Sequence, residues 1–124
     1  MVAPASADTH TSRRAVNLPT ETLDFTGLLG GVAKTGQAAV KNADGNTVGT
    51  AVQQCSNVLS GNAYCTGLIT FSGSGSLAYA ANIPTSATGS YTGVVAGGTD
   101  SLEGITGEIK GTITSHTVEE LVFE

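Results

Sequence analysis

The fold of this chain is decided by residues 94–110, which read VVAGGTDSLEGITGEIK. A short apolar strand is followed by a double-glycine turn, a five-residue link, a glycine and a second strand in which apolar and polar residues alternate. Alternation with a period of two is typical of a strand with one buried face. Because so short a link cannot carry a helical crossover, the two strands are expected to be antiparallel neighbours.

The same pattern recurs along the chain. The predicted strands cover residues 22–29, 37–42, 47–55, 66–71, 76–83, 89–95, 107–114 and 117–124. Asp44-Gly45 is the strongest hairpin signal among the turns that separate them. Since the connections are short and the apolar residues lack a helical period, we predict an all-β fold, a small closed antiparallel β-barrel of about eight strands. Such a barrel has room for packed side chains or for one small ligand.

Composition limits the classes of partner. The chain has 124 residues, of which 12% are charged, and a net charge of −5. One domain is expected at this length, and nucleic acid is excluded as a partner because its binding needs clustered Lys and Arg. The sequence contains no apolar run of about 18 residues, so no membrane-spanning helix is expected. Two cysteines and two distant histidines do not make a metal site, and no metal is expected.

The first residues differ in composition from the rest. Residues 1–13 are small, polar and unpatterned, and we expect a flexible tail before a single barrel domain at 14–124. Within that tail, Ala5-Ser6-Ala7 satisfies the small-residue rule of a signal-peptide cleavage site, although no basic and apolar segment precedes it. The segment therefore predicts a signal-peptide remnant, with a chance match as the alternative.

The two cysteines support export. Cys55 and Cys65 lie on two strand-like runs joined by a turn at residues 60–62. A turn centred on Ser60 makes them cross-strand partners at the short separation that a disulfide requires. Closing this loop would stabilise the fold by roughly 3 kcal/mol in the chain-entropy model. A disulfide favours a secreted protein, and the alternative is a pair of buried free thiols in a cytoplasmic one.

Three segments together resemble a known barrel superfamily. Residues 63–71 read AYCTGLITF, residues 75–79 read GSLAY, and residues 94–109 read VVAGGTDSLEGITGEI. In this order they resemble the barrel shared by allene oxide cyclases, plant dirigent proteins and bacterial spirotetronate cyclases. The resemblance covers roughly residues 23–124, and its most specific part is Gly97-Gly98-Thr99 with Gly104 and Gly107.

The resemblance implies a function in natural-product biosynthesis. Members of the superfamily enclose an apolar cavity, need no cofactor, and fold a flexible unsaturated substrate so that its ring closes with a set stereochemistry. By this resemblance the chain is a cofactor-free cyclase or isomerase, and pericyclic closure of a polyketide-type substrate is the most specific form. The chain departs from the pattern in two ways. It has no Trp, and the acidic residue that the plant enzymes carry on the first strand has no clear match near Val16-Asn17-Leu18.

Buried polar side chains are the candidates for catalysis. Tyr79 shares its strand face with Leu77 and Ala81, so its hydroxyl could bond a substrate carbonyl. Alternation places either Glu119 or Glu120 on the apolar face of the last strand, where a carboxylate could act as a general acid or base. The alternatives are tyrosines whose hydroxyls lie at the rim, and a last strand that is partly wet on both faces.

The expected ligand contacts are two further tyrosines and three apolar strand residues: Tyr64, Tyr91, Ile69, Phe71 and Ile109. His10 and His116 have no partner at ligand or triad spacing and are expected at the surface. Three functions stay open. They are the cyclase or isomerase, a secreted barrel that binds a small hydrophobic molecule without converting it, and a structural role in which outward Thr and Val pair subunits into a homo-oligomer.

Overall fold

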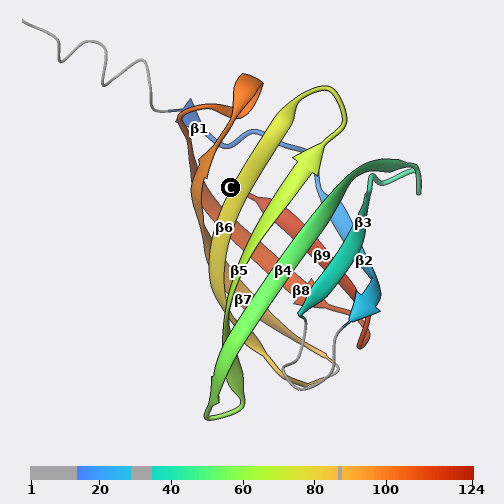
Figure 1. The fold of residues 1–124 in the computed structure, drawn as a ribbon, viewed down its shortest axis with the longest axis vertical. Helices are drawn as coiled ribbons and strands as arrows, with labels where there is room; N and C mark the ends of the chain where they lie inside the picture. The colour runs from blue at the N-terminus through green and yellow to red at the C-terminus, as the bar shows by residue number, and fades with distance from the viewer. Residues whose placement is uncertain (1–13, 29–34, 87) are drawn as a thin grey trace, which may run out of the picture.

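A computed structural model describes residues 14–28, 35–86 and 88–124. The expected tail at residues 1–13 therefore lies outside the described residues. Within them the chain forms strands and one 3-10 helix (Figure 1). They are β1 (Arg14–Ala15), β2 (Glu21–Leu28), β3 (Gly36–Lys41), β4 (Thr47–Leu59), β5 (Asn62–Phe71), β6 (Gly75–Pro84), β7 (Gly89–Gly98), η1 (Asp100–Leu102), β8 (Ile105–Ile113) and β9 (Val118–Phe123).

Strands β2 to β9 close into a barrel. Consecutive strands pair antiparallel, and β9 pairs with both β8 and β2, which joins the ends of the sheet. The predicted all-β, eight-stranded closed antiparallel barrel is thus confirmed. β1 lies outside this ring and pairs parallel with β8, with Arg14 opposite Ile105. Closure leaves no free edge on the eight strands of the ring.

Two tight turns set the register of the central strands. In the β3–β4 turn, the Asn42 side-chain oxygen accepts hydrogen bonds from the backbone N–H groups of Asp44 and Asn46, both at 3.0 Å. In the β4–β5 turn, Ser60 and Gly61 have φ of 56° and 82°, which is the pattern of a type I′ hairpin. Both turns lie where the sequence predicts them.

The double glycine has a different place from the one expected. Gly97 and Gly98 end strand β7, and the chain turns after them through η1. A Cβ on Gly98 would lie 2.3 Å from the carbonyl oxygen of Leu102 and 2.9 Å from its Cβ. The glycine therefore serves close packing of η1 on the sheet, and the prediction of a double-glycine turn is wrong in this detail.

The core residues face the barrel interior. Burial alternates along the long strands, as in β5, where Ala63, Cys65 and Ile69 are buried and their outward neighbours are not. The largest wholly buried apolar side chains, each at most 1% exposed, are Leu23, Ile69, Leu77, Ile83, Ile109 and Leu121. Most of the interior is thus aliphatic, and polar side chains inside it are exceptions that need an explanation.

Candidate active site

Among the residues that the structure describes, five polar side chains lie inside this aliphatic barrel. They are Glu119, Tyr79, Gln53, Glu21 and Tyr91, with exposed fractions of 0%, 2%, 3%, 3% and 8%. A buried polar group costs free energy unless it is hydrogen-bonded, so each of them is expected to need a polar partner inside the barrel. A cluster of this kind is a candidate functional site.

The first part of the cluster is the Glu119 unit, made of Tyr91, Gly111 and Glu119. Tyr91 of β7 lies directly opposite Gly111 of β8. A Cβ on Gly111 would lie 2.2 Å from Cζ of the Tyr91 ring, so the ring can occupy this space only above a glycine. The ring thereby crosses β8, and its hydroxyl donates a 2.6 Å hydrogen bond to Oε1 of Glu119 on β9.

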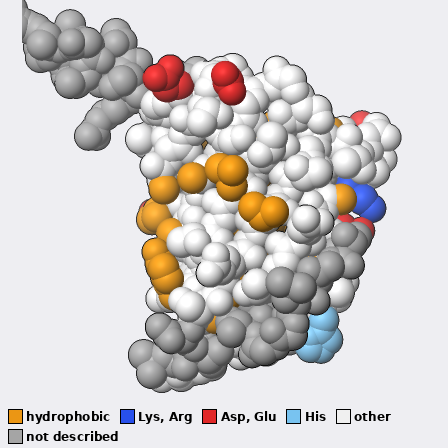
Figure 2. Space-filling model, viewed as in Figure 1, with side chains coloured by type: hydrophobic (Ala, Val, Ile, Leu, Met, Phe, Trp, Pro, Cys, Tyr) orange, Lys and Arg blue, Asp and Glu red, His pale blue; other side chains and the backbone are white. Residues whose placement is uncertain are grey.

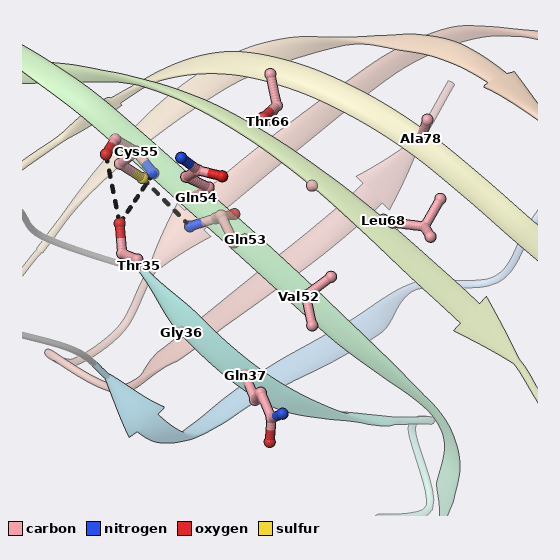
Figure 3. A pocket seen from close by; sticks show the side chains of 11 residues that line it. Thr35, Gly36, Gln37, Val52, Gln53, Gln54, Cys55, Thr66, Leu68 and Ala78 are labelled. Carbon is pink, nitrogen blue, oxygen red and sulfur yellow. Dashed lines mark hydrogen bonds between the residues drawn. The ribbon is translucent and has the colours of Figure 1, made fainter.

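The second part is the Gln53 unit, made of Tyr79, Gly67 and Gln53. Tyr79 of β6 lies opposite Gly67 of β5, and a Cβ there would lie 2.2 Å from Cζ of the ring. The ring crosses β5, and its hydroxyl donates a 2.5 Å hydrogen bond to Oε1 of Gln53 on β4. The Gln53 amide nitrogen in turn lies 3.9 Å from Sγ of Cys55 (Figure 3).

The two units share one electrostatic environment. Burial raises the pKa of Tyr79 and of Tyr91 far above the usual tyrosine value, and the nearby charge of Glu119 raises both further. Donating the hydrogen bond to Glu119 adds to the effect on the pKa of Tyr91. Both hydroxyls therefore stay protonated at neutral pH. The interior offers neutral hydrogen-bond donors beside a carboxylate, a combination that suits proton transfer to and from a ligand.

A second interior acid, Glu21, was not among the predicted site residues. It lies opposite Leu121 while Leu23 lies opposite Glu119, so the two acids are diagonal neighbours on the inner face of the β2–β9 pair. Within the described residues, Oε1 of Glu21 is buried without a hydrogen-bond partner. Desolvation by burial raises the pKa of Glu21. The alternation of Glu21 with Leu23 and Phe25 is a sequence signal that could have revealed it.

Most of the predicted site residues are interior. Tyr79, Tyr91, Glu119, Ile69 and Ile109 are all buried. Phe71 is half-buried and packs against the edge of the core. The structure thus brings Tyr79, Tyr91 and Glu119 together, and it adds Gln53, which the alternation of Ala51, Gln53 and Cys55 could have indicated.

Two predicted site residues are outside the barrel. Glu120 is exposed because Glu119 takes the inward position on β9. Tyr64 is 52% exposed, since its neighbours Ala63 and Cys65 are the inward residues of β5. The expectation that Glu120 and Tyr64 could face a cavity inside the barrel is corrected by this alternation.

The expected disulfide is present. Cys55 and Cys65 are opposite each other in the β4–β5 register, with an S–S distance of 1.96 Å and a Cα–Cα distance of 4.0 Å. Both are buried, so the bridge lies on the inner side of the wall, next to Gln53. The alternative of two free thiols is therefore wrong. Among the described residues no helix is long and apolar enough to cross a membrane.

A pocket of about 800 Å³ lies on the outer wall, against the strands that carry the Gln53 unit (Figure 3). Its lining includes the outward side chains Val52, Gln54 and Leu68, all exposed. The inward residues Gln53 and Cys55 alternate with them along β4. The full lining is Thr35, Gly36, Gln37, Val52, Gln53, Gln54, Cys55, Thr66, Gly67, Leu68 and Ala78.

Comparison with known proteins supports the fold. A solved structure described as a pyocyanin demethylase matches with a TM-score of 0.60 and 22% sequence identity, covering 85% of this chain and 99% of that one. At this identity the likeness shows a shared barrel fold. No family model and no curated protein matches the chain, so the resemblance to allene oxide cyclases and dirigent proteins stays a prediction.

Proposed function

We propose that this chain is a cofactor-free isomerase or cyclase that binds an unsaturated, largely apolar metabolite inside the barrel. The observation that carries the proposal is the 2.6 Å hydrogen bond between the buried Tyr91 hydroxyl and the Glu119 carboxylate. Apolar residues at these positions would avoid the cost of burying a charge. A site that acts on a ligand gives a reason for keeping both groups.

In the proposed reaction Glu119 moves one proton. Its carboxylate takes the proton from a carbon next to an unsaturated group and returns it to another carbon of the same molecule. The proton balance therefore closes without an oxidant or reductant. The hydrogen bond that the Tyr91 hydroxyl donates to Oε1 holds the Glu119 side chain in place. The amide nitrogen of Gln53 is the group proposed to bond a substrate carbonyl, and the Tyr79 hydroxyl holds that amide in place through its hydrogen bond to Oε1.

The surrounding core is proposed to shape the substrate. Glu119 of β9 lies opposite Leu23 of β2 on one side and opposite Ile113 of β8 on the other. The side chains of Leu23 and Ile113 are both buried. Apolar walls on both sides of a carboxylate suit a hydrocarbon chain that is folded around the reacting carbon. Holding a flexible polyene in one shape lowers the entropic part of the barrier to isomerisation or ring closure.

Solvent-deuterium exchange on simple ketones tests the proposal, so the natural substrate does not have to be identified first. The protein is incubated in D₂O with a series of β,γ-unsaturated ketones of increasing chain length, and deuterium in the recovered ketone is measured by mass spectrometry. We expect catalysed exchange by the parent and by the Glu120→Gln variant, whose altered side chain is outside the barrel. Glu119→Gln should abolish the exchange and Tyr91→Phe should reduce it. Equal exchange in the parent and in Glu119→Gln would overturn the proposal.

The second candidate is a secreted barrel that binds a small hydrophobic molecule without converting it. The buried disulfide favours it, because disulfides persist in oxidising compartments, whereas biosynthetic cyclases commonly work in the cytoplasm beside their pathway partners. Native mass spectrometry of the protein purified from its producer separates the candidates. If the bound hydrophobic metabolite is released chemically unchanged and the protein catalyses no deuterium exchange on any ketone, the result supports the non-catalytic carrier.

We also propose that the chain self-associates into a homo-oligomer. Within the described part of the chain, five large hydrophobic side chains are exposed on the outside of the barrel: Val52, Tyr64, Leu68, Val94 and Val122. Single exposed apolar residues are ordinary, but several of them near one another mark an interaction surface. Sedimentation velocity over a range of protein concentrations tests this, and a constant monomer would exclude self-association.

A further inference from the structure

Half of the outer barrel wall carries no charge. No Asp, Glu, Lys, Arg or His occurs between Gly45 and Thr99, a stretch that contains all of β4, β5, β6 and β7. These four strands are consecutive in the barrel. Figure 2 views this side: its surface is mostly uncharged, with hydrophobic side chains across its middle and charged ones at the margins.

The charged outward residues of the barrel strands belong to its other half. Glu108 and Lys110 are exposed on β8, Glu120 is exposed on β9, and Lys41 of β3 forms a 3.0 Å ion pair with Asp24 of β2. The whole chain has a net charge of −5. An uncharged wall places no like charges of two copies opposite each other, so two copies can meet through it at low electrostatic cost.

The uncharged wall contains both a hollow and a projecting side chain. The hollow is the outer pocket of about 800 Å³, which is lined by Val52, Leu68 and Ala78 among others. Tyr64, which is 52% exposed, follows the same outward row of β5 as Thr66 and Leu68. Successive outward residues of a strand are about 7 Å apart. The tyrosine and the hollow thus lie side by side on one surface.

We infer that two copies of this chain associate through the β4–β7 wall, with Tyr64 of each copy inserted into the hollow of the other. This names the surface of the self-association proposed above and rests on that proposal. In a two-fold interface the same patch serves both copies, so a projection next to a hollow fills both hollows at once. Tyrosine is a common anchor of such contacts, and Gln54 and Thr66 offer hydrogen-bond partners to its hydroxyl.

The two-fold arrangement makes a specific prediction for Thr66. The axis has to pass between Tyr64 and the hollow, which places Thr66 of one copy against Thr66 of the other. Both natural cysteines are in the disulfide, so Thr66→Cys would carry the single free thiol. We expect Thr66→Cys to form a disulfide-linked dimer under mild oxidation. The matched control is Thr112→Cys, at an exposed position on β8 in the charged half, which should stay monomeric on a non-reducing gel.

Sedimentation equilibrium tests the role of Tyr64. We expect Tyr64→Ser to weaken the dimer at least about tenfold. Val122→Ser, which alters an exposed hydrophobic residue on β9, should leave the dissociation constant within about twofold of the parent. Near-UV circular dichroism confirms that both variants are folded. Added salt should not weaken the parent dimer, because the interface contains no charges.

The possible failures are distinguishable. A parent chain that is monomeric at every concentration overturns self-association together with this inference. If the parent associates and Tyr64→Ser associates just as strongly, only the assigned surface is overturned. A dimer or larger assembly that Tyr64→Ser weakens, but that Thr66→Cys does not cross-link, overturns the two-fold arrangement. None of these results bears on the deuterium exchange expected at Glu119.

Discussion

Tyr79 and Tyr91 are held in the same way, and they reach different partners. Each ring lies above a glycine of the next strand, Gly67 or Gly111, where a Cβ would come within 2.2 Å of the ring. Each hydroxyl then bonds a polar side chain on the following strand. In the Gln53 unit that partner is a neutral amide, and in the Glu119 unit it is a carboxylate.

The comparison separates the contribution of the backbone, which lets the ring cross a strand, from the contribution of the hydrogen-bond partner, which is neutral or charged. A tyrosine above a glycine carries a hydroxyl across one strand at any such position in the barrel. Hydrogen bonds to charged groups contribute about 1.5–3 kcal/mol, and those between neutral groups about 0.5–1.5 kcal/mol. The Gln53 unit is therefore suited to binding a neutral group, and the Glu119 unit to proton transfer.

Removing the disulfide is expected to have the largest effect, and it should act on one unit more than on the other. Replacing both cysteines by serine should lower the free energy of unfolding by about 3 kcal/mol. Because Gln53 contacts Sγ of Cys55, the ring signals of Tyr79 should move while those of Tyr91 stay. Urea unfolding and NMR of ¹³C-labelled tyrosine measure both effects, and equal movement of the two rings would contradict the separation of the units.

Filling the space under each ring is expected to have the next largest effect. Gly67→Ala and Gly111→Ala should each lower the free energy of unfolding by about 2 kcal/mol, because the new methyl group overlaps a packed ring. Adding Tyr79→Ala to Gly67→Ala should recover part of this loss, as measured by urea unfolding. Adding Tyr79→Ala to Gly111→Ala is the matched control. Recovery in that control as well would show that the two units are not independent.

Removing one hydroxyl at a time compares the partners directly. Tyr91→Phe should lower the free energy of unfolding by about 2 kcal/mol, and Tyr79→Phe by about 1 kcal/mol, since only the first removes a hydrogen bond to a carboxylate. Urea unfolding near neutral pH measures the difference. A larger loss for Tyr79→Phe would reverse the assignment of the charged unit.

Alkaline pH should produce the smallest effect and should act on both units alike. The pKa of both tyrosines is raised in the folded state, so above about pH 10 the unfolded chain releases protons that the folded chain retains. Stability is therefore complete below that pH and falls as the pH rises. Each tyrosine should account for about 0.8 kcal/mol of the loss at about pH 10.5. Urea unfolding of the parent and of both Phe variants measures this loss. If a Phe variant loses as much stability at alkaline pH as the parent does, the hydroxyl that the variant lacks is not buried.

Much of the fold was predictable because its signals are local. Period-two alternation and turn residues such as Asp44-Gly45 depend on neighbours in the chain, and they placed the eight barrel strands within a few residues. β1 was not predicted, because two residues show no periodicity. The place of Gly98 was also missed, since its contact with Leu102 arises only when η1 folds back onto the sheet.

The site was predictable only in part. Alternation shows that one of Glu119 and Glu120 faces inward, but it does not say which, because a shift of one residue exchanges the two faces of a strand. The same ambiguity applies to Tyr64, whose neighbours proved to be the inward residues. Gln53 and Glu21 alternate with apolar residues, so a signal for both is present in the sequence.

By itself, the sequence determined that the chain folds as a closed antiparallel barrel, that Cys55 and Cys65 are cross-strand neighbours, and that the β4–β7 segment is uncharged. All three depend on the order of residues along the chain. Only the tertiary structure placed Gly111 under Tyr91 and Glu119 within its reach. That placement depends on the register of three strands around a closed ring. The register is set by packing of the whole core, so no single stretch of sequence contains it.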